Sequence, residues 1–481
     1  MNTTSTSNKR RRWPWIVLAI LVVLGLAAWL GSYALRGGGD PKAGPPVAVT
    51  PALVARGAYL ARAGDCVACH TAPGGAPFAG GLPIASPIGK IYSSNITPDR
   101  DSGIGGWSYG QFERAVRRGI GHDGTPLYPA MPFPSYARVT DEDVAALYAY
   151  FMQGVRPVSQ KDKPTDIPWP LSLRWPLAWW RTLFAPTPEK ALAAAAPADP
   201  AVARGAYLVE GLGHCGSCHT PRALTLQEKA LSDADGSLYL SGGSADNWIA
   251  PSLRGEPVSG LGQWSPEKIA TFLQTGRTGD SAAFGGMADV VQHSTGYMDT
   301  EDLGAIAAYL KTLAPHRQET AAQDDGKAAA TLLAATPGDD LGARVYLDTC
   351  NTCHRSKGQG WQGVYPALAG NAAVNSTDPT GLINLVISGG IMPTTRAAPA
   401  QFAMPAFGER LSDADVAAVL TFVRRSWGNR AAAVDPAKVK SVRAALKTPE
   451  NPYSLYDPRQ NQPQTQRNQE GTSRAEDAAA Q

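Results

Sequence analysis

Three copies of the pentapeptide CxxCH constrain this chain more than any other feature of its sequence. They occupy residues 66–70, 215–219 and 350–354, and together they contain all six cysteines of the 481-residue chain. Two cysteines at this spacing, followed directly by a histidine, form the signature for covalent attachment of c-type haem, with the histidine as proximal iron ligand. The sequence therefore predicts three covalently bound haem c groups.

The motifs also assign the attachment and ligand residues. The predicted thioether cysteines are Cys66, Cys69, Cys215, Cys218, Cys350 and Cys353, and the predicted proximal ligands are His70, His219 and His354. A CxxC redox pair and half of a zinc site use the same cysteine spacing, but neither requires a histidine directly after the second cysteine. Because every cysteine is assigned, no thiol remains for a structural disulfide.

The sequence around the motifs repeats three times. RGAYL at 56–60 precedes the first motif, RGAYL at 204–208 precedes the second, and a looser GARVY at 342–346 precedes the third. Each copy ends in an apolar helical pattern that begins with a capping signal: Thr140 with Asp143, Thr300 with Asp302, and Ser412 with Asp415. We expect the opening glycine to let the opening and closing helices cross closely, with an aromatic ring packed at the crossing.

These patterns predict a mainly α fold of three tandem class-I-like cytochrome c domains plus an N-terminal transmembrane or signal helix. We name the predicted domains repeat 1 (50–155), repeat 2 (199–315) and repeat 3 (338–429). The remaining segments are predicted as a membrane anchor or signal segment (1–36), a Trp/Pro-rich crossover (156–198), a linker (316–337) and a polar, disordered tail (430–481).

A methionine opposite each histidine is predicted to be the sixth iron ligand, because a thioether keeps the iron low-spin and raises its reduction potential. Met131 and Met404 each stand beside a proline shortly before a closing helix. In repeat 2 both Met287 and Met298 are available, and Met287 is preferred because Met298 lies almost at the start of the closing helix. Two further candidates are interpreted as a packing residue and a solvated side chain, respectively: Met392 and His122.

The N-terminus carries a membrane or export signal. Basic residues at 9–12 precede an uncharged apolar run at 15–35, which is long enough, at about 1.5 Å per residue, to cross a bilayer core. The run exceeds the usual h-region and so favours a retained anchor, although Ser32-Tyr33-Ala34 is an acceptable cleavage site. Under either interpretation the haem domains are predicted on the periplasmic side of the cytoplasmic membrane, because basic residues keep their end cytoplasmic.

Residues 167–184 of the crossover contain four tryptophans with interspersed arginines. This segment is too polar and too often interrupted by proline to span a bilayer. It suits a membrane or protein interface, and it suits equally a strap packed over the first or second haem. Nucleic acid is not an expected partner, because the formal charge is only +3 and no basic cluster recurs on a folded segment.

Several motifs together identify a family. With the three CxxCH motifs, SSNITP at 93–98, the loop 119–131, the Trp-Pro-Leu crossover and HST at 293–295, the chain resembles the triheme cytochrome c subunits of bacterial membrane-bound dehydrogenases of the alcohol, gluconate and sorbitol type. The resemblance implies that electrons arrive from a large quinoprotein or flavoprotein subunit, accompanied by a small subunit, and leave to ubiquinone. It also implies haem ligation by the motif histidines with three methionines opposite: Met131, Met287 and Met404.

Three functions of different classes are the alternatives for this chain. An electron-transfer subunit of a dehydrogenase complex is favoured, and it needs no substrate-oxidising site of its own, in keeping with the lack of a flavin or dinucleotide fingerprint. A free-standing multihaem carrier that delivers electrons to a terminal oxidase is the alternative. A haem peroxidase needs an open iron, and the three available methionines argue against it. The sequence leaves open the partner's substrate, the order of haem potentials and the quinone site.

Overall fold

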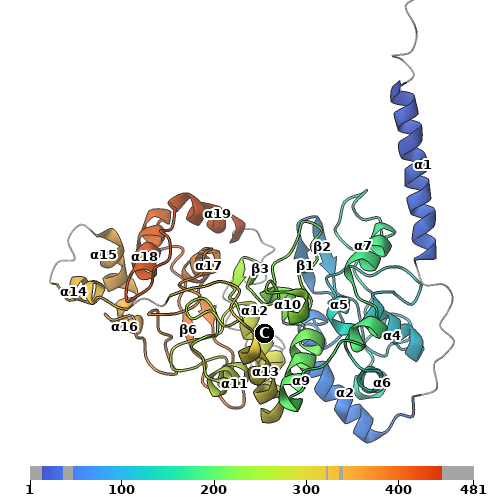
Figure 1. The fold of residues 1–481 in the computed structure, drawn as a ribbon, viewed down its shortest axis with the longest axis horizontal. Helices are drawn as coiled ribbons and strands as arrows, with labels where there is room; N and C mark the ends of the chain where they lie inside the picture. Colours follow the sequence, from blue (N-terminus) through green and yellow to red (C-terminus); the bar gives the residue numbers. More distant parts are fainter. Residues whose placement is uncertain (1–12, 36–46, 321–322, 335–339, 447–481) are drawn as a thin grey trace, which may run out of the picture. The chain divides into compact units, whose positions relative to one another are not determined.

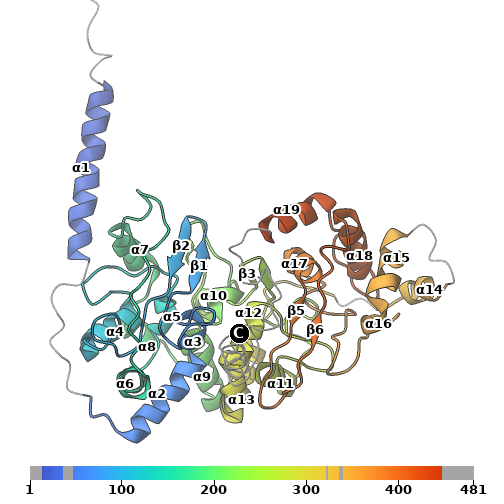
Figure 2. The same ribbon diagram turned by 180° about the vertical axis from the view of Figure 1, so that it is seen from behind.

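The computed structural model describes residues 13–35, 47–320, 323–334 and 340–446. These residues form helices joined by long loops, and strands occur among them only in three short antiparallel hairpins (Figures 1 and 2). The mainly α class is thereby confirmed. Contacts divide the chain into two compact units, the first holding 1–57, 83–92 and 97–194, and the second 58–82, 93–96 and 195–481.

Each repeat contains an opening helix, a one-turn helix on CxxCH, a middle helix and a closing helix. Repeat 1 has α2 (Pro51–Ala63), α3 (Cys66–Cys69), β1 (Pro83–Ser86), β2 (Gly89–Tyr92), α4 (Tyr109–Arg118), α5 (Phe133–Tyr136) and α6 (Asp141–Ala149), extended by the π-turn η2 (Tyr150–Gly154). Repeat 2 has α9 (Pro200–Ala206), continued by the π-helical η3 (Tyr207–Leu212), then α10 (Gly216–His219), η4 (Asp233–Asp235), β3 (Gly243–Ala245), β4 (Trp248–Ala250), α11 (Pro266–Thr275), α12 (Gly286–His293), η5 (Thr295–Tyr297) and α13 (Thr300–Thr312). Repeat 3 has α15 (Leu341–Thr349), α16 (Asn351–His354), α17 (Thr380–Ser388), β5 (Gly390–Ile391), β6 (Ala403–Met404) and α18 (Asp413–Arg425). Outside the repeats lie α1 (Trp13–Ala34), α7 (Pro176–Phe184), α8 (Pro188–Leu192), α14 (Lys327–Leu333) and α19 (Pro436–Leu446).

The opening and closing helices of each repeat cross at a glycine. A Cβ atom added to Gly57 would lie 1.9 Å from the backbone oxygen of Ala146 and 2.6 Å from Cβ of Tyr150. The same two contacts recur in the other repeats: Gly205 against Ala305 and Tyr309, and Gly342 against Ala418 and Phe422. No larger residue fits at these crossings, and an aromatic side chain covers each of them, as the repeat pattern predicted.

Ion pairs flank two of the three crossings. Asp143 accepts from Arg56 over 2.7 Å in repeat 1, and Asp302 accepts two bonds from Arg204, of 2.7 and 2.8 Å, in repeat 2. In repeat 3 a leucine precedes the crossing glycine, and Asp415 instead completes a capping box with Ser412. The predicted start of α13 is one residue late, because its N-cap is Asp299 and Thr300 is already helical.

Two segments predicted as linker and tail contain helices that pack on repeat 3. Leu332 of α14, inside the predicted linker, belongs to the same buried cluster as Tyr346 of α15. Within the predicted tail, Val439 and Val442 of α19 are buried in that cluster too. Their spacing of three residues places them on one helical face, a signal that the polar composition of the surrounding segment obscured. Residues 447–481 of the predicted tail lie outside the described residues.

A pair of glycine substitutions tests the helix crossing. We expect Gly205→Ala to lower the free energy of unfolding by about 1–3 kcal/mol, because its Cβ would lie 2.0 Å from the Ala305 oxygen. Gly304→Ala on α13 meets nothing within 4 Å and should raise stability by up to about 1 kcal/mol, since alanine favours helix. Thermal unfolding of the haem-loaded proteins measures both, and equal effects would contradict the close crossing.

Candidate haem-binding sites

Each CxxCH motif forms a single helical turn that is closed by a backbone bond. The amide of the histidine donates to the carbonyl of the first cysteine in all three motifs, over 3.0 Å for His70, 3.0 Å for His219 and 2.9 Å for His354. The two cysteines and the histidine of a motif therefore lie on one turn, with all six cysteines as free thiols. This is the local geometry that two thioether bonds and one iron ligand on the same side require.

A backbone carbonyl accepts a hydrogen bond from Nδ1 of each motif histidine. The acceptors are Ser94 at 2.7 Å for His70, Pro251 at 2.8 Å for His219 and Pro366 at 3.0 Å for His354. This bond makes Nδ1 the protonated nitrogen and leaves the lone pair of Nε2 for a metal. Burial lowers the pKa of all three imidazoles, so they are neutral at pH 7 and able to ligate iron.

The thiols lie in surroundings that suit attachment and not redox exchange. Burial raises the pKa of four of them to about 12: Cys66, Cys69, Cys215 and Cys350. A CxxC redox pair works through a thiolate, which a raised pKa disfavours at neutral pH. Among the described residues, no group of three or more His, Cys, Asp or Glu side chains could hold a metal ion.

The three candidate methionine ligands are half-buried and lie in three different local settings. Met131 stands in the turn before α5, Met287 in the first turn of α12, and Met404 in β6 opposite Gly390. The less favoured candidates Met298 and Met392 are 7% and 3% exposed. Both side chains are therefore more deeply buried than the three preferred methionines.

The crossover packs on the loop that carries Met131, all within the first compact unit. The Arg174 guanidinium lies 4.1 Å from the Tyr128 ring centroid, and its Nε donates to the Pro126 carbonyl over 3.0 Å. Trp180 of α7 meets Phe133 edge to face with ring centroids 6.1 Å apart. One side of the crossover is thus a strap over this loop, while Trp169 and other side chains remain exposed.

The first and second motifs lie side by side within the second compact unit. Burial, the Asp65 carboxylate and Cys218 together raise the pKa of Cys69, so thiols of the two motifs are electrostatic neighbours. Nε2 of His214, the residue before the second motif, lies 3.4 Å from the carbonyl oxygen of Gly64. The cysteines that would attach two haem groups therefore lie near each other at this contact.

The second and third repeats meet through the segments that carry Met287 and Met404. A Cβ on Gly390, which pairs with Met404, would lie 2.8 Å from the Phe284 ring, three residues before Met287. A Cβ on Gly276 would lie 2.2 Å from the Pro393 ring. The methionine sides of these two repeats therefore face each other.

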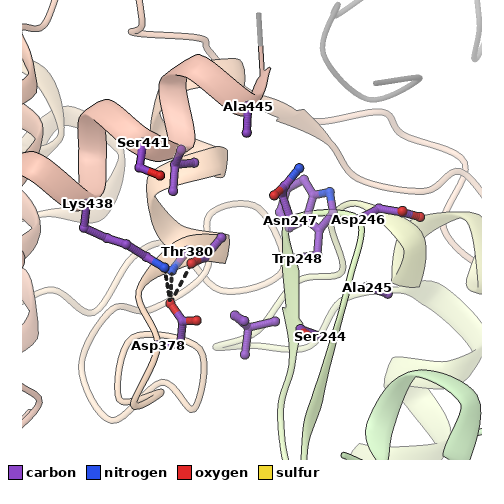
Figure 3. A pocket seen from close by; sticks show the side chains of 12 residues that line it. Ser244, Ala245, Asp246, Asn247, Trp248, Asp378, Thr380, Lys438, Ser441 and Ala445 are labelled. Atoms are coloured by element: carbon purple, nitrogen blue, oxygen red, sulfur yellow. Dashed lines mark hydrogen bonds and ion pairs between the residues drawn. The ribbon is translucent and has the colours of Figure 1, made fainter. Parts of the chain in front are cut away.

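A polar cavity of 260 Å³ lies between the β3–β4 hairpin and helices α17 and α19 (Figure 3). Asp378 accepts a 2.6 Å bond from the Thr380 hydroxyl there and pairs with Lys438 at 3.5 Å. None of the predicted cysteine, histidine or methionine ligands lines this cavity. It is therefore separate from the candidate haem ligands.

Several buried polar atoms have no hydrogen-bond partner among the described residues, as expected where a haem would be held. They include Nε1 of Trp248, Nη1 of Arg277 and the hydroxyl of Tyr239. Buried donors normally have acceptors, and the propionate carboxylates of a haem are acceptors at the porphyrin edge. Nothing in the sequence pattern singled out these residues, because a Trp or Arg carries no local signal of burial.

Comparison with known proteins agrees with this geometry. The cytochrome c family model matches residues 54–154 and 340–427. The chain is 55% identical to the gluconate 2-dehydrogenase cytochrome c subunit of Pantoea cypripedii, over 82% of this chain and 90% of that protein. It is 50% identical to the cytochrome c subunit of the alcohol dehydrogenase (quinone) of Gluconobacter oxydans, over 82% and 84%, and 37% identical to the fructose dehydrogenase cytochrome subunit of Gluconobacter japonicus, over 84% and 86%. The chain therefore belongs to the family of cytochrome c subunits of membrane-bound dehydrogenases.

Proposed function

We propose that this chain carries three covalent haem c groups and passes electrons from a dehydrogenase subunit to ubiquinone. The observation that carries the proposal is the threefold recurrence of a buried, neutral histidine whose Nδ1 is held by a carbonyl and whose Nε2 is left for iron. Bound haem c supplies a one-electron couple, and the chain attaches it through the motif cysteines. The methionines proposed as further iron ligands are Met131, Met287 and Met404.

Repeat 2 occupies the middle of the electron path in this proposal. Its CxxCH side adjoins the motif of repeat 1 through Cys69 and Cys218, and its Met287 side adjoins repeat 3 through Phe284 and Gly390. Electrons that enter at one terminal repeat would leave at the other. This arrangement gives repeat 2 two redox neighbours and each terminal repeat one.

A large quinoprotein or flavoprotein subunit, together with a small subunit, is proposed as the electron donor. The named relatives serve dehydrogenases of gluconate, alcohol and fructose, so substrate oxidation in this complex falls to the partner. The word quinone in the name of the alcohol dehydrogenase supports a quinone acceptor. A route to a terminal oxidase is the alternative that the experiment below separates.

Contacts between α1 and α7 support attachment of this chain to the periplasmic face of the membrane. The 22-residue α1 is long and apolar enough to cross a membrane and is almost fully exposed. Near its C-terminal end, Trp179 Nε1 donates to the Ala28 carbonyl over 3.0 Å, and a Cβ on Gly31 would lie 2.8 Å from the Trp179 ring. The exposed Trp169 and Leu183 then lie in the segment nearest the bilayer surface, where tryptophan is favoured.

Quinone reduction by the partner complex tests the proposed conduit. We expect the dehydrogenase with this subunit to reduce ubiquinone, and the same dehydrogenase without it to reduce only artificial acceptors, because electrons then lack a path to the membrane. Equal quinone reduction without the subunit would contradict the proposal. Oxidation by a terminal oxidase without quinone would favour the free-standing carrier.

Methionine substitutions in repeat 2 test the sixth ligand. Met287→Leu should leave three haems attached but convert one of them to high spin, because the iron loses its thioether. Met298→Leu should keep every haem low-spin and cost less than about 1.5 kcal/mol, as expected of a volume-conserving change in a buried side chain. Optical and electron paramagnetic resonance spectra distinguish the two, and the reverse result would assign Met298 as ligand.

The mass of the mature protein tests the anchor. A retained α1 predicts an intact mass that includes residues 13–34, and release from membranes by detergent but not by alkaline carbonate, since about 20 apolar residues hold a helix in the bilayer. A mature chain that starts after Ala34 would contradict the anchor and identify a cleaved signal.

A further inference from the structure

Alignment of the repeats at the end of their middle helices reveals a charge that only repeat 2 carries. Each middle helix ends at a left-handed glycine: Gly119, Gly276 and Gly389, with φ of 62°, 71° and 69°. The following residues are Ile120, Arg277 and Gly390, and each of them forms a β-bridge to the loop beyond. A guanidinium thus stands where the other two repeats have an aliphatic side chain or none.

Arg277 is a partly buried cation with an unsatisfied donor. Its Nη1 has no hydrogen-bond partner among the described residues, and its guanidinium lies 5.0 Å from the Phe402 ring centroid. Phe402 precedes Met404 by two residues, so the charge lies where the Met287 and Met404 segments meet. A buried donor on a cation is costly to leave unpaired, which calls for an anionic acceptor at this place.

Trp248 supplies a second unsatisfied donor that is also particular to repeat 2. It stands three residues before Pro251, the acceptor for His219, and the corresponding positions before Ser94 and Pro366 are Ile91 and Gly363. Its Nε1 is buried without a partner.

The Trp248 ring also reaches the methionine side of the same repeat. A Cβ on Gly285, two residues before Met287, would lie 2.4 Å from it. Figure 3 shows Trp248 on the β3–β4 hairpin at the wall of the polar cavity. Trp248 therefore contacts the segment that carries Met287 and stands on the hairpin that leads to Pro251, the acceptor for His219.

We propose that Trp248 Nε1 and Arg277 Nη1 donate hydrogen bonds to the propionate carboxylates of the haem attached to repeat 2. The positive charge of Arg277 then raises the reduction potential of that haem, because a nearby cation disfavours the more positive ferric iron. Both residues position and tune the haem and take no part in its attachment. The inference rests on the proposed function, since it requires a haem on Cys215 and Cys218.

Redox titration of the full-length protein tests the charge. Removing a unit charge that acts over about 10 Å at an effective dielectric constant of about 20 changes a redox equilibrium by about tenfold or more, which is about 59 mV for one electron. We expect Arg277→Gln to lower one of three potentials by this amount and Arg277→Lys to retain most of the wild-type value. Trp248→Phe keeps the ring, removes only the donor, and should lower the same potential by a smaller amount.

A matched control and a marker make the result specific. Arg396 lies on the loop that leads to Phe402, and its side chain is exposed. Arg396→Gln removes an equal charge that water already screens, so it should change the redox equilibrium constant of every haem less than twofold. In a Met287→Leu background, the high-spin spectrum marks the haem of repeat 2.

The outcomes separate this inference from the function on which it rests. A downward shift confined to the marked haem supports it, whereas a shift of another haem, or equal shifts in Arg277→Gln and Arg396→Gln, overturns it. Intact mass counts the attached haems first. Fewer than three in the wild type would instead overturn the proposed function.

Discussion

The hydrogen bond from each motif histidine to a backbone carbonyl is the interaction on which the rest of the arrangement depends. It settles three properties of the ligand at once: the tautomer, the ring orientation and the nitrogen that remains free. The carbonyl belongs to a loop that follows the motif. This loop must therefore fold back to within hydrogen-bonding distance of the histidine. The glycine crossings act upstream of this bond, because they determine where the opening helix ends and the CxxCH turn starts.

The three repeats share the glycine crossing and the histidine–carbonyl bond, and they differ in the elements around these two features. Between the crossing glycine and the first cysteine, repeat 2 has one residue more than repeat 1, and its opening helix accommodates the difference with the π-helical η3. Such insertions into helices are frequent at functional sites. Repeat 3 lacks the Arg–Asp pair at the crossing but gains α14 and α19 against its core. Each haem site therefore has different surroundings, which is how one fold can provide different redox potentials.

Much of the fold was predictable because its determinants are local. The cysteines, the histidines and the crossing glycines each carry their meaning within a few residues of sequence. The carbonyl acceptors could not be predicted, because they follow their histidines by 24, 32 and 12 residues and any residue type can supply a carbonyl. The burial of Val439 and Val442 could not be predicted for another reason. A helix with a narrow apolar face in a polar segment gains its stability from tertiary packing.

The crossover contacts both α1 and the loop that carries Met131. It holds α1 through Trp179 and grips the Met131 loop through Arg174 and Trp180. The position of α1 relative to this loop is therefore set by side-chain packing inside one compact unit. A displacement of α1 would then be passed on to the Met131 loop through these side chains.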